Sequence, residues 1–477
     1  MTAAPIIVWY RQDLRIADNP ALSAAVATGR PIIPLYILDQ ESDGLRPMGG
    51  ASLWWLHGSL ECLSQDLHDL GAPLILRNGA AQAVLNQLMA ETGADTVYWN
   101  RCYEPGAIAR DTAIKNALQD KGIEADSFNG SLLYEPWEIK TQQDKPYRVF
   151  TPFYRMVLAQ GTPAQPLPKP QSIKPYAAPL QSDALTDWSL LPTKPNWAAS
   201  FSKYWSPGEA GAHTLLSDFL DDRITVYKAE RDFPGIAATS RLSPHLHFGD
   251  ISPRQIWAAT SVVEPTAGSE TFLKEVVWRE FGYSLLYYNP TMPTAPLQAK
   301  FNAFPWTKND PYLVAWQTGQ TGYPIVDAGM RELWATGTMH NRVRMVVASF
   351  LVKHLLIHWR EGEAWFWDTL VDADLASNTA NWQWVSGCGA DAAPYFRIFN
   401  PITQGEKFDA DGTYVRQWVS EIADLPDKFI HKPWEASDDD LKKAGVRLGD
   451  TYPHPIVDHK VAREKALAAL ASIKQTD

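Results

Sequence analysis

The chain has 477 residues, and 43 Lys and Arg stand against 54 Asp and Glu, which gives a formal net charge of −11. This length predicts two or three domains, and the 45% apolar and 20% charged residues are typical of a globular protein. The acidic balance argues against non-specific coating of nucleic acid, which requires a broad basic surface, but it allows a local basic site. The 20 tryptophans could fill a core or serve in stacking and redox chemistry.

The cysteines and the apolar runs exclude several classes of protein. Cys62, Cys102 and Cys388 form no CxxC pair, so we expect neither a disulfide framework nor a Cys-based zinc site. No run approaches the roughly 18 apolar residues of a membrane helix, and the start of the chain lacks the features of a signal peptide. We therefore expect a cytoplasmic protein without membrane association.

The first 130 residues alternate short apolar runs with helical patterns, which predicts βαβ units on a parallel sheet. Strands are predicted at Ile6–Tyr10, Ile32–Leu38, Leu74–Leu76, Thr96–Trp99 and Ala125–Phe128. Helices are predicted at Pro20–Thr28, Ser52–Leu70 and Ala80–Thr92. The first turn, at residues 11–15, contains no glycine, so this Rossmann-like domain lacks the usual dinucleotide fingerprint.

The composition changes near Gly161, where a proline-rich stretch with few periodic apolar positions extends to Trp197. Such a stretch is typical of an extended linker between domains. Beyond Pro207 the pattern is helical almost throughout, up to a last helix near Asp458–Ile473. We therefore expect an α/β domain at 1–132, a linker at 133–200 and an all-α domain at 201–477.

Two segments of the helical part carry polar groups that could hold a ligand. Thr239, Ser240 and Ser243 accompany Arg241 just before a predicted helix that starts near Pro244, which indicates either a phosphate site or a simple N-cap. Further along, one helical face carries Glu275, Trp278, Arg279 and Gly282. That face indicates either a binding surface or a Glu–Arg pair beside a buried tryptophan.

A third segment is predicted to be one long helix, Met339–Trp359. Asn341, Arg344 and Met345 begin an apolar stripe on it that continues through Ala348, Val352 and Leu355. If this turn is buried, the amide and the guanidinium need a partner, which could be a ligand or another helix. Arg342 projects in another direction and could reach a phosphate.

The fourth segment is acidic and then aromatic. Asp372 and Asp374 resemble a metal loop, but no further ligand follows at EF-hand spacing, so calcium is rejected and no metal is expected. Asn378 and Trp382 are four residues apart and share a helical face. The alternative interpretation is an Asp-rich cap before an amphipathic helix.

Taken together, these segments resemble the flavin domain of the DNA photolyase/cryptochrome family. The matching strings are TSRLSPHLHFGD at 239–250, EVVWREF at 275–281, TGYPIVDAGMREL at 321–333, MHNRVRM at 339–345, DADLASNTANWQW at 372–384 and DAAPYFRIFNPITQGEKFD at 391–409. The opening VWYRQDLRIADNPAL resembles the family's first strand and turn. The resemblance covers nearly the whole chain.

This resemblance implies FAD as the cofactor, bound in the helical domain. The implied FAD-binding residues are Tyr227, Thr239, Ser240, Arg241, Leu242, Ser243, Arg279, Asn341, Arg344, Asp372, Asp374 and Asn378. Asn378 would face the flavin N5, and photolyases carry asparagine there, whereas plant-type and insect-type cryptochromes carry aspartate and cysteine. The implied electron-transfer chain consists of Trp382, Trp359 and Trp306.

The resemblance also implies light-driven repair of cyclobutane pyrimidine dimers in DNA, in which reduced FAD donates an electron, the dimer splits and the electron returns. Photolyases that repair (6-4) photoproducts carry two histidines where Asn341 and Met345 stand here. Asn341 and Met345 are therefore implied as lesion contacts. Glu275 would hydrogen-bond the dimer, and Trp278 and Trp384 would stack on it. The implied contacts to the DNA backbone are Arg231, Arg342, Arg397, Gln404 and Lys407.

An antenna chromophore is implied for the α/β domain. Glu104 matches an acidic residue that binds the folate antenna in bacterial relatives, but the Cys-Lys pair of that site is missing from 290–301. The segment around Trp54 resembles class III members, in which a folate sits elsewhere. We expect methenyltetrahydrofolate, with 8-hydroxy-5-deazaflavin as the alternative. The alternatives for function are a blue-light receptor without repair and a (6-4) photolyase. We expect a monomer that joins the nucleoid when bound to damage.

Overall fold

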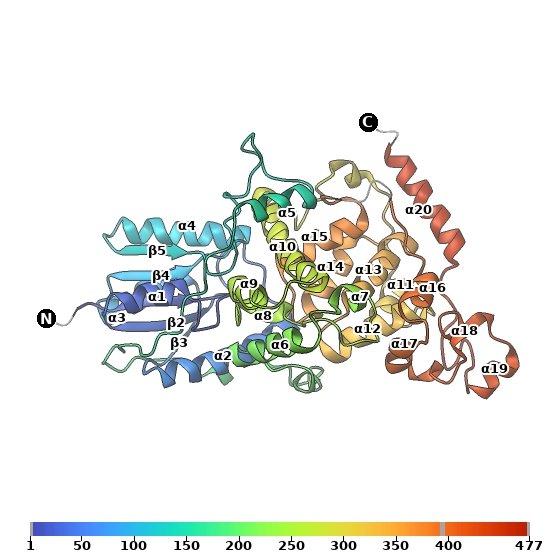
Figure 1. Ribbon diagram of the computed structural model, residues 1–477, viewed down its shortest axis with the longest axis horizontal. Helices are drawn as coiled ribbons and strands as arrows, with labels where there is room; N and C mark the ends of the chain where they lie inside the picture. Colours follow the sequence, from blue (N-terminus) through green and yellow to red (C-terminus); the bar gives the residue numbers. More distant parts are fainter. Residues whose placement is uncertain (1–2, 392–395, 475–477) are drawn as a thin grey trace. The chain divides into compact units, whose positions relative to one another are not determined.

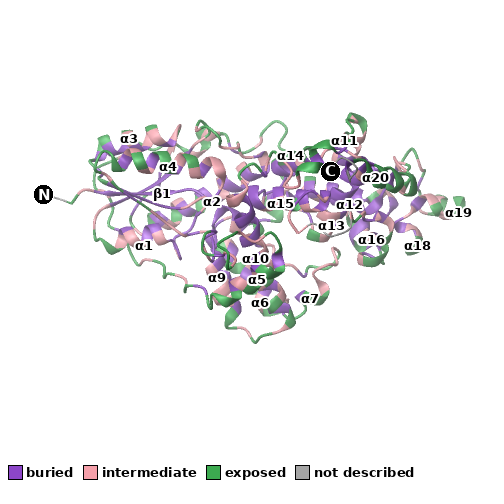
Figure 2. Cartoon of the chain, turned by 90° about the horizontal axis from the view of Figure 1, so that it is seen from above, coloured by how far each residue is buried: buried purple, intermediate pink, exposed green. Residues whose placement is uncertain are grey.

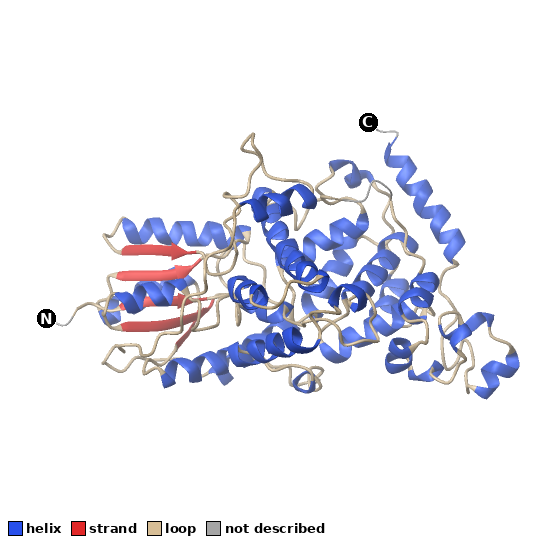
Figure 3. Ribbon diagram, in the orientation of Figure 1, coloured by secondary structure: helices blue, strands red, loops and turns tan. Residues whose placement is uncertain are grey.

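The computed structural model describes residues 3–391 and 396–474. The chain forms two compact units. The first unit consists of Met1–Thr225 and Ser240–Pro290, and the second consists of Val226–Thr239 and Thr291–Asp477. Among the described residues, all five strands belong to the first unit, and the second is built from helices and loops (Figures 1 and 3).

The sheet of the first unit is parallel, with the strand order β3-β2-β1-β4-β5. Its strands are β1 (Ile6–Tyr10), β2 (Ile32–Leu38), β3 (Ile75–Asn78), β4 (Thr96–Asn100) and β5 (Glu124–Phe128). The fold class expected from the sequence is confirmed. The bounds of β1 and β2 are as predicted, and those of the other three strands differ by one or two residues.

Helices cover both faces of this sheet, as the buried apolar runs of its strands require. The helices of the α/β region are α1 (Pro20–Ala27), α2 (Gly50–Asp69), α3 (Ala81–Thr92) and α4 (Pro105–Gln119). Leu85 of α3 and Leu118 of α4 join Trp9 and Trp99 in one buried cluster, and α1 contacts β1 and β4 from the other side (Figure 2). Trp9 and Trp99 meet edge to face at 6.0 Å, so these two tryptophans are core residues.

The proline-rich stretch follows the edge of the sheet. Ile32 at the start of β2 donates from its N–H to the carbonyl of Lys174, and the N–H of Asp183 donates to the carbonyl of Leu76 in β3. Before it, α5 (Phe150–Ala159) forms within the segment that the sequence predicted to be a linker. Phe150 and Phe153 are buried, and their packing stabilises this helix. The proline-rich composition of the surrounding segment does not reveal this packing.

The remaining helices are divided between the two units. The first unit contains α6 (Glu209–Asp222), α8 (Ser243–Phe248), α9 (Pro253–Ser261) and α10 (Ala267–Tyr288). The second contains α7 (Tyr227–Glu230), α11 (Asp310–Gln317), α12 (Pro324–Thr336), α13 (Asn341–Ser349), α14 (Trp359–Thr369), α15 (Leu375–Ser386), α16 (Pro401–Phe408), α17 (Thr413–Trp418), α18 (Asp427–Ile430), α19 (Asp438–Lys443) and α20 (His459–Lys474). Within the described ranges, no helix has the length and hydropathy needed to span a membrane.

The prediction of one helix over Met339–Trp359 is wrong. The α-helix α13 ends at Ser349, one π-helical turn covers Phe350–His354, and α14 begins only at Trp359. Leu356 has a left-handed backbone with φ of 52°, which turns the chain between the two helices. The sequence hides this break because residues 350–355 are buried on every side and their apolar pattern therefore carries no helical phase.

A buried carboxyl group ties α10 to the segment that follows β5. Glu280 accepts hydrogen bonds from the backbone N–H groups of Leu133 (2.9 Å) and Tyr134 (3.4 Å). Burial raises the pKa of Glu280 from its ordinary 4.5 to about 8. The folded chain therefore keeps a proton that the unfolded chain has released between these two pH values, and the stability that Glu280 contributes falls as the pH rises through this window.

We expect Glu280→Gln to gain stability relative to the wild type as the pH rises from 5 to 8, because the amide oxygen accepts the same two hydrogen bonds and never ionises. Chemical denaturation of both proteins across this pH range measures the effect. Parallel stability profiles for the two proteins would contradict a titrating Glu280.

Candidate active site

Residues 240–243 of the hydroxyl-rich segment lie in the first unit, where Arg241 is held by two contacts. Arg241 has a left-handed backbone with φ of 57°. Its guanidinium lies 4.2 Å from the ring of Trp205 and donates to the carbonyl of Tyr204 at 3.1 Å. Leu242 occupies the N-cap position of α8 without a side-chain cap, so the simple hydroxyl N-cap is wrong here. Ser243 is exposed at the first position of α8.

The expected binding face of α10 is held in place by contacts within the first unit. Trp278 stacks on Phe150 with a ring separation of 3.6 Å and an interplanar angle of 6°. Arg279 donates to the carbonyl of Ser131 at 2.8 Å and lies over Tyr283 at 4.7 Å. Glu275 is half-buried on the same helix. These contacts fix one face of the Trp278 indole and the direction of the Arg279 side chain.

In the second unit, Arg344 and Asp372, both expected near the flavin, form an ion pair. The Nη2 atom of Arg344 lies 2.9 Å and 3.1 Å from the two carboxylate oxygens of Asp372, and its Nε donates to the carbonyl of Met339 at 2.7 Å. Asp374 caps α15 by accepting from the N–H of Ser377 at 2.7 Å, so the capping interpretation of this residue is confirmed.

Other residues expected near the flavin have different surroundings. Tyr227 is buried beneath Arg231, whose guanidinium lies 5.1 Å from the tyrosine ring. Thr239 is half-buried, and Asn341 is exposed at the start of α13. The buried residues of α13 are Val343, Val346, Val347, Ala348 and Ser349, so the predicted stripe is buried as far as Ala348 within this helix. The predicted continuation of the Asn341 face into an apolar stripe through Leu355 is therefore wrong, because the helix ends before that residue.

The amide of Asn378 is oriented by a glutamate that sequence reasoning did not find. Its Nδ2 donates to the Oε1 atom of Glu363 at 2.8 Å and to the carbonyl of the same residue at 3.1 Å. Both N–H bonds of the amide therefore point to α14, and Oδ1 faces the opposite way. Glu363 is buried and follows Trp359 by four residues, a spacing that places both on one helical face.

Three tryptophans follow α15 and α14 toward the surface of the second unit. Trp382 and Trp359 are buried, and Trp306 is half-exposed. His358 bridges the outer two rings, at 5.0 Å from Trp306 and 5.6 Å from Trp359. The indole of Trp382 packs on Gly362, one helical turn beyond Trp359. His358 thus links the outer two rings, and Trp382 packs against the same helix that begins at Trp359.

We expect Gly362→Ala to destabilise the protein, because the new Cβ would lie 2.1 Å from Cη2 of Trp382 and 2.6 Å from Cδ2 of Leu351. Such overpacking costs about 1–3 kcal/mol. Thermal denaturation measures the loss. Ala364→Ser, on the exposed side of the same helix, is the control and should stay within about 0.5 kcal/mol of the wild type. Equal stability of all three proteins would contradict this packing.

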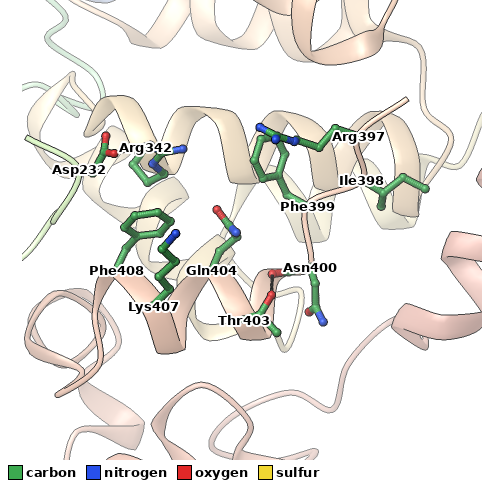
Figure 4. Close-up of a pocket in the computed structure, with 10 residues that line it drawn as sticks. All are labelled: Asp232, Arg342, Arg397, Ile398, Phe399, Asn400, Thr403, Gln404, Lys407 and Phe408. Carbon is green, nitrogen blue, oxygen red and sulfur yellow. Dashed lines mark hydrogen bonds and ion pairs between the residues drawn. The ribbon is translucent and has the colours of Figure 1, made fainter. Parts of the chain in front are cut away.

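Four of the five residues expected to contact the DNA backbone line one pocket of about 510 Å³ in the second unit (Figure 4). We call it the basic pocket. Its lining residues are Asp232, Arg342, Arg397, Ile398, Phe399, Asn400, Thr403, Gln404, Lys407 and Phe408. The fifth expected residue, Arg231, directly precedes Asp232.

The basic pocket combines cations with aromatic rings. The guanidinium of Arg342 lies 4.5 Å from the ring of Phe408, and the ammonium of Lys407 lies 5.0 Å from it. Arg342 also contacts the sulfur of Met345 at 3.9 Å, which places an expected lesion contact next to the pocket. Trp384 is half-buried and donates from Nε1 to the carbonyl of Asp391 at 3.1 Å.

The pocket segment 396–400 is anchored from beneath by residues that sequence reasoning missed. The N–H of Phe399 donates to Oγ of Ser349 at 3.2 Å, and Nζ of Lys353 donates to the carbonyl of Arg397. Lys353 is buried in the π-helical turn, and this burial lowers its pKa to about 7. The sequence signal that could have revealed this contact is a lysine within the apolar run at residues 350–355.

Residues 6–171 match the family model described as "DNA photolyase", and residues 272–472 match "FAD binding domain of DNA photolyase". The chain is 54% identical, over 100% of its length and 99% of the relative's, to a protein of Agrobacterium fabrum named deoxyribodipyrimidine photo-lyase. The chain belongs to the DNA photolyase/cryptochrome family. A plant family member, cryptochrome-2 of Arabidopsis thaliana, is 39% identical over 98% of this chain and 79% of its own length.

A solved structure of this family has the same fold. The crystal structure of a bacterial class III photolyase from Agrobacterium tumefaciens superposes with a TM-score of 0.97 at 54% identity, and the match covers 100% of this chain and 99% of the other. The family expected from the sequence motifs is thus confirmed, and the chain contains the family's FAD-binding domain. Residues 392–395 of the last motif lie outside the described residues.

The two residues expected at the family's antenna site both lie in the first unit. Glu104 is the N-cap residue of α4 and accepts from Nε2 of Gln12 at 3.2 Å. Trp54 is half-buried in α2 and meets Trp55 and Phe201 edge to face. The antenna site remains a prediction.

Proposed function

We propose that this protein repairs cyclobutane pyrimidine dimers in DNA with light. The observation that carries the proposal is the basic pocket, in which Arg342, Arg397, Gln404 and Lys407 converge beside Met345. Met345 and Asn341 stand where (6-4) photolyases of this family carry histidines. The 54% identity to a protein named deoxyribodipyrimidine photo-lyase supports the same activity.

The residues of the chain fit FAD as the resident cofactor. We propose that Tyr227 and the hydroxyl-rich segment 239–243 bind the diphosphate, and that Arg279, Asn341, Arg344, Asp372 and Asp374 bind the flavin and its ribityl chain. The paired Arg344 and Asp372 offer both a cation and an anion to a polar ring edge. Asn378 presents Oδ1 because Glu363 occupies both of its N–H bonds. Bound FAD would supply the light absorption and the electron that the repair requires.

The protein's own side chains would act on the dimer and on the tryptophan chain. We propose that Glu275 hydrogen-bonds the dimer, where it stabilises the charge that the bases acquire, and that Trp278 and Trp384 stack on the extruded bases. Trp382, Trp359 and Trp306 would carry an oxidising equivalent outward, which keeps the cofactor reduced. Phe150 holds Trp278 in one orientation, so this ring is ready before DNA binds.

DNA binding would depend on local rather than overall charge. The chain carries a net charge of −11, yet the basic pocket presents three cationic side chains and one carboxylate. Arg342 and Gln404 each keep one buried polar atom, Nε and Oε1, without a hydrogen-bond partner among the described residues. Buried polar atoms are normally paired, so these two atoms favour a polar ligand in the pocket. Arg231 would extend the same backbone contact.

Two other functions remain alternatives. The 39% identity to a plant cryptochrome keeps a light receptor without repair in consideration, although Asn378 and Glu275 favour repair. Repair of (6-4) photoproducts is the other alternative. We further propose a cytoplasmic monomer that joins the nucleoid at damage, domains at 1–132, 133–200 and 201–477, and an antenna of methenyltetrahydrofolate or 8-hydroxy-5-deazaflavin near Trp54 or Glu104.

The test uses two oligonucleotides that differ only in the lesion, one with a cyclobutane dimer and one with a (6-4) photoproduct. The FAD-loaded, reduced protein is illuminated with each, and restored thymines are measured by chromatography. We expect loss of the cyclobutane dimer alone. Loss of the (6-4) photoproduct alone, or of neither lesion despite bound FAD, would overturn the proposal.

A further inference from the structure

The basic pocket contains one acidic residue among those that line it, Asp232. Its carboxylate lies 2.6 Å from Nη2 of Arg342, and Figure 4 shows the two side chains pointing toward each other at one end of the pocket. The side chain of Asp232 is 35% exposed and that of Arg342 is 19% exposed, so the pair is open to solvent. An anion that enters the pocket therefore meets an arginine that already has a partner.

The pairing uses only part of the guanidinium. Nη2 donates to Asp232, whereas the buried Nε atom has no hydrogen-bond partner among the described residues. Nε and one Nη form the edge with which arginine binds two oxygens of a carboxylate or a phosphate at once. A phosphodiester with two free oxygens could use both donors, while Asp232 uses one. Exchange of the carboxylate for a phosphate would therefore take place at this edge of the guanidinium.

The stack on Phe408 makes this exchange possible without moving the arginine. The guanidinium lies 4.5 Å from the Phe408 ring, and its Nη1 contacts the sulfur of Met345 at 3.9 Å. These contacts hold the plane of the guanidinium independently of Asp232. The neighbouring Arg231 lies over Tyr227 at 5.1 Å.

We propose that Asp232 is a competing anion for Arg342: in the DNA-free protein its carboxylate takes the place of a DNA phosphate, and it lowers the affinity for DNA until a phosphate displaces it. This inference rests on the proposed function, because it assumes that DNA enters the basic pocket. Asp232 acts through Arg342 and is a positioning residue for DNA binding rather than a catalytic residue. We therefore expect the protein to bind more weakly to DNA whose phosphates do not reach the edge of the basic pocket.

The test is a double-mutant cycle of Asp232→Asn and Arg342→Met, with Kd measured for dimer-containing duplex over a range of salt concentrations. We expect Asp232→Asn to tighten binding by about two- to tenfold and to steepen the salt dependence, since a charge at a binding rim acts on both. In the Arg342→Met background the same change should have a much smaller effect. Glu421→Gln, which removes a partner of Arg331 outside the pocket, is the matched control and should leave Kd unchanged.

Equal tightening in both backgrounds would overturn the proposal, because Asp232 would then act only as a through-space charge. Weaker binding by Asp232→Asn would also overturn it and would show that the carboxylate orients Arg342 for DNA. Flavin absorbance and thermal stability confirm that each variant is folded. If the wild type repairs dimers but the cycle shows no coupling, only this inference fails. If the wild type neither binds nor repairs dimer DNA, the proposed function fails, and the inference fails with it.

Discussion

Trp382→Phe is expected to abolish photoreduction of oxidised FAD while leaving repair by the chemically reduced protein intact. The indole of Trp382 is buried against Gly362, one turn from Trp359, and a phenyl ring in the same space keeps the packing but is much harder to oxidise. Photoreduction is measured from the change in flavin absorbance while the protein is illuminated in the presence of an external electron donor. Repair is measured separately after reduction with dithionite.

Trp316→Phe is the matched control for this experiment. Trp316 is also buried and meets Trp382 edge to face at 6.2 Å, but it lies outside the proposed chain. We expect its variant to photoreduce like the wild type. Normal photoreduction in Trp382→Phe, together with loss in Trp316→Phe, would show that the oxidising equivalent leaves by another route.

Glu275→Ala is expected to lower the yield of repair far more than it lowers FAD binding. A hydrogen bond to a charged group contributes about 1.5–3 kcal/mol, which corresponds to about a tenfold or larger loss when the dimer carries charge. The repair yield per absorbed photon is compared with FAD occupancy from absorbance. Glu275→Gln introduces an amide of similar shape that can donate or accept a hydrogen bond, so it should recover part of the yield.

The control on the same helix is Glu270→Ala, in the exposed first turn of α10. It removes one carboxylate from the helix without touching the expected binding face. We expect its repair yield to equal that of the wild type. If Glu275→Ala loses FAD and repair in the same proportion, Glu275 is a structural residue and not a contact to the dimer.

The sequence predicted the architecture well where a short, continuous apolar run corresponds to a single strand. The strands β1 and β2 are buried along their whole length between helices, and their bounds were found without error. The same reasoning failed at Phe350–His354, because residues that are buried on all sides look alike in a straight helix and in a π-helical turn. It also missed α5, which lies in the segment predicted to be a linker. The aromatic residues of α5 pack against α10, and this contact is not visible in the local sequence.

The site shows a similar division. Motifs named Arg342, Arg397 and Trp382, since these residues stand in long recognisable strings. Trp359 and Trp306 lie outside those strings and were named because the family resemblance implies a chain of three tryptophans. The motifs did not identify Glu363, Lys353 or Asp232, because each acts on a residue distant in sequence: Glu363 orients Asn378, Lys353 supports Arg397, and Asp232 pairs with Arg342. Such partners depend on tertiary contacts, which spacing along one helix does not encode.

The most direct test of light-driven dimer repair is the time course of cyclobutane dimers in a preformed complex of the FAD-reduced protein with damaged DNA, kept in the dark and then illuminated. We predict a constant dimer content in the dark and a loss in the light that continues over several turnovers per protein. A dimer content that stays constant in the light, in a protein with FAD bound and reduced, would contradict the proposed function.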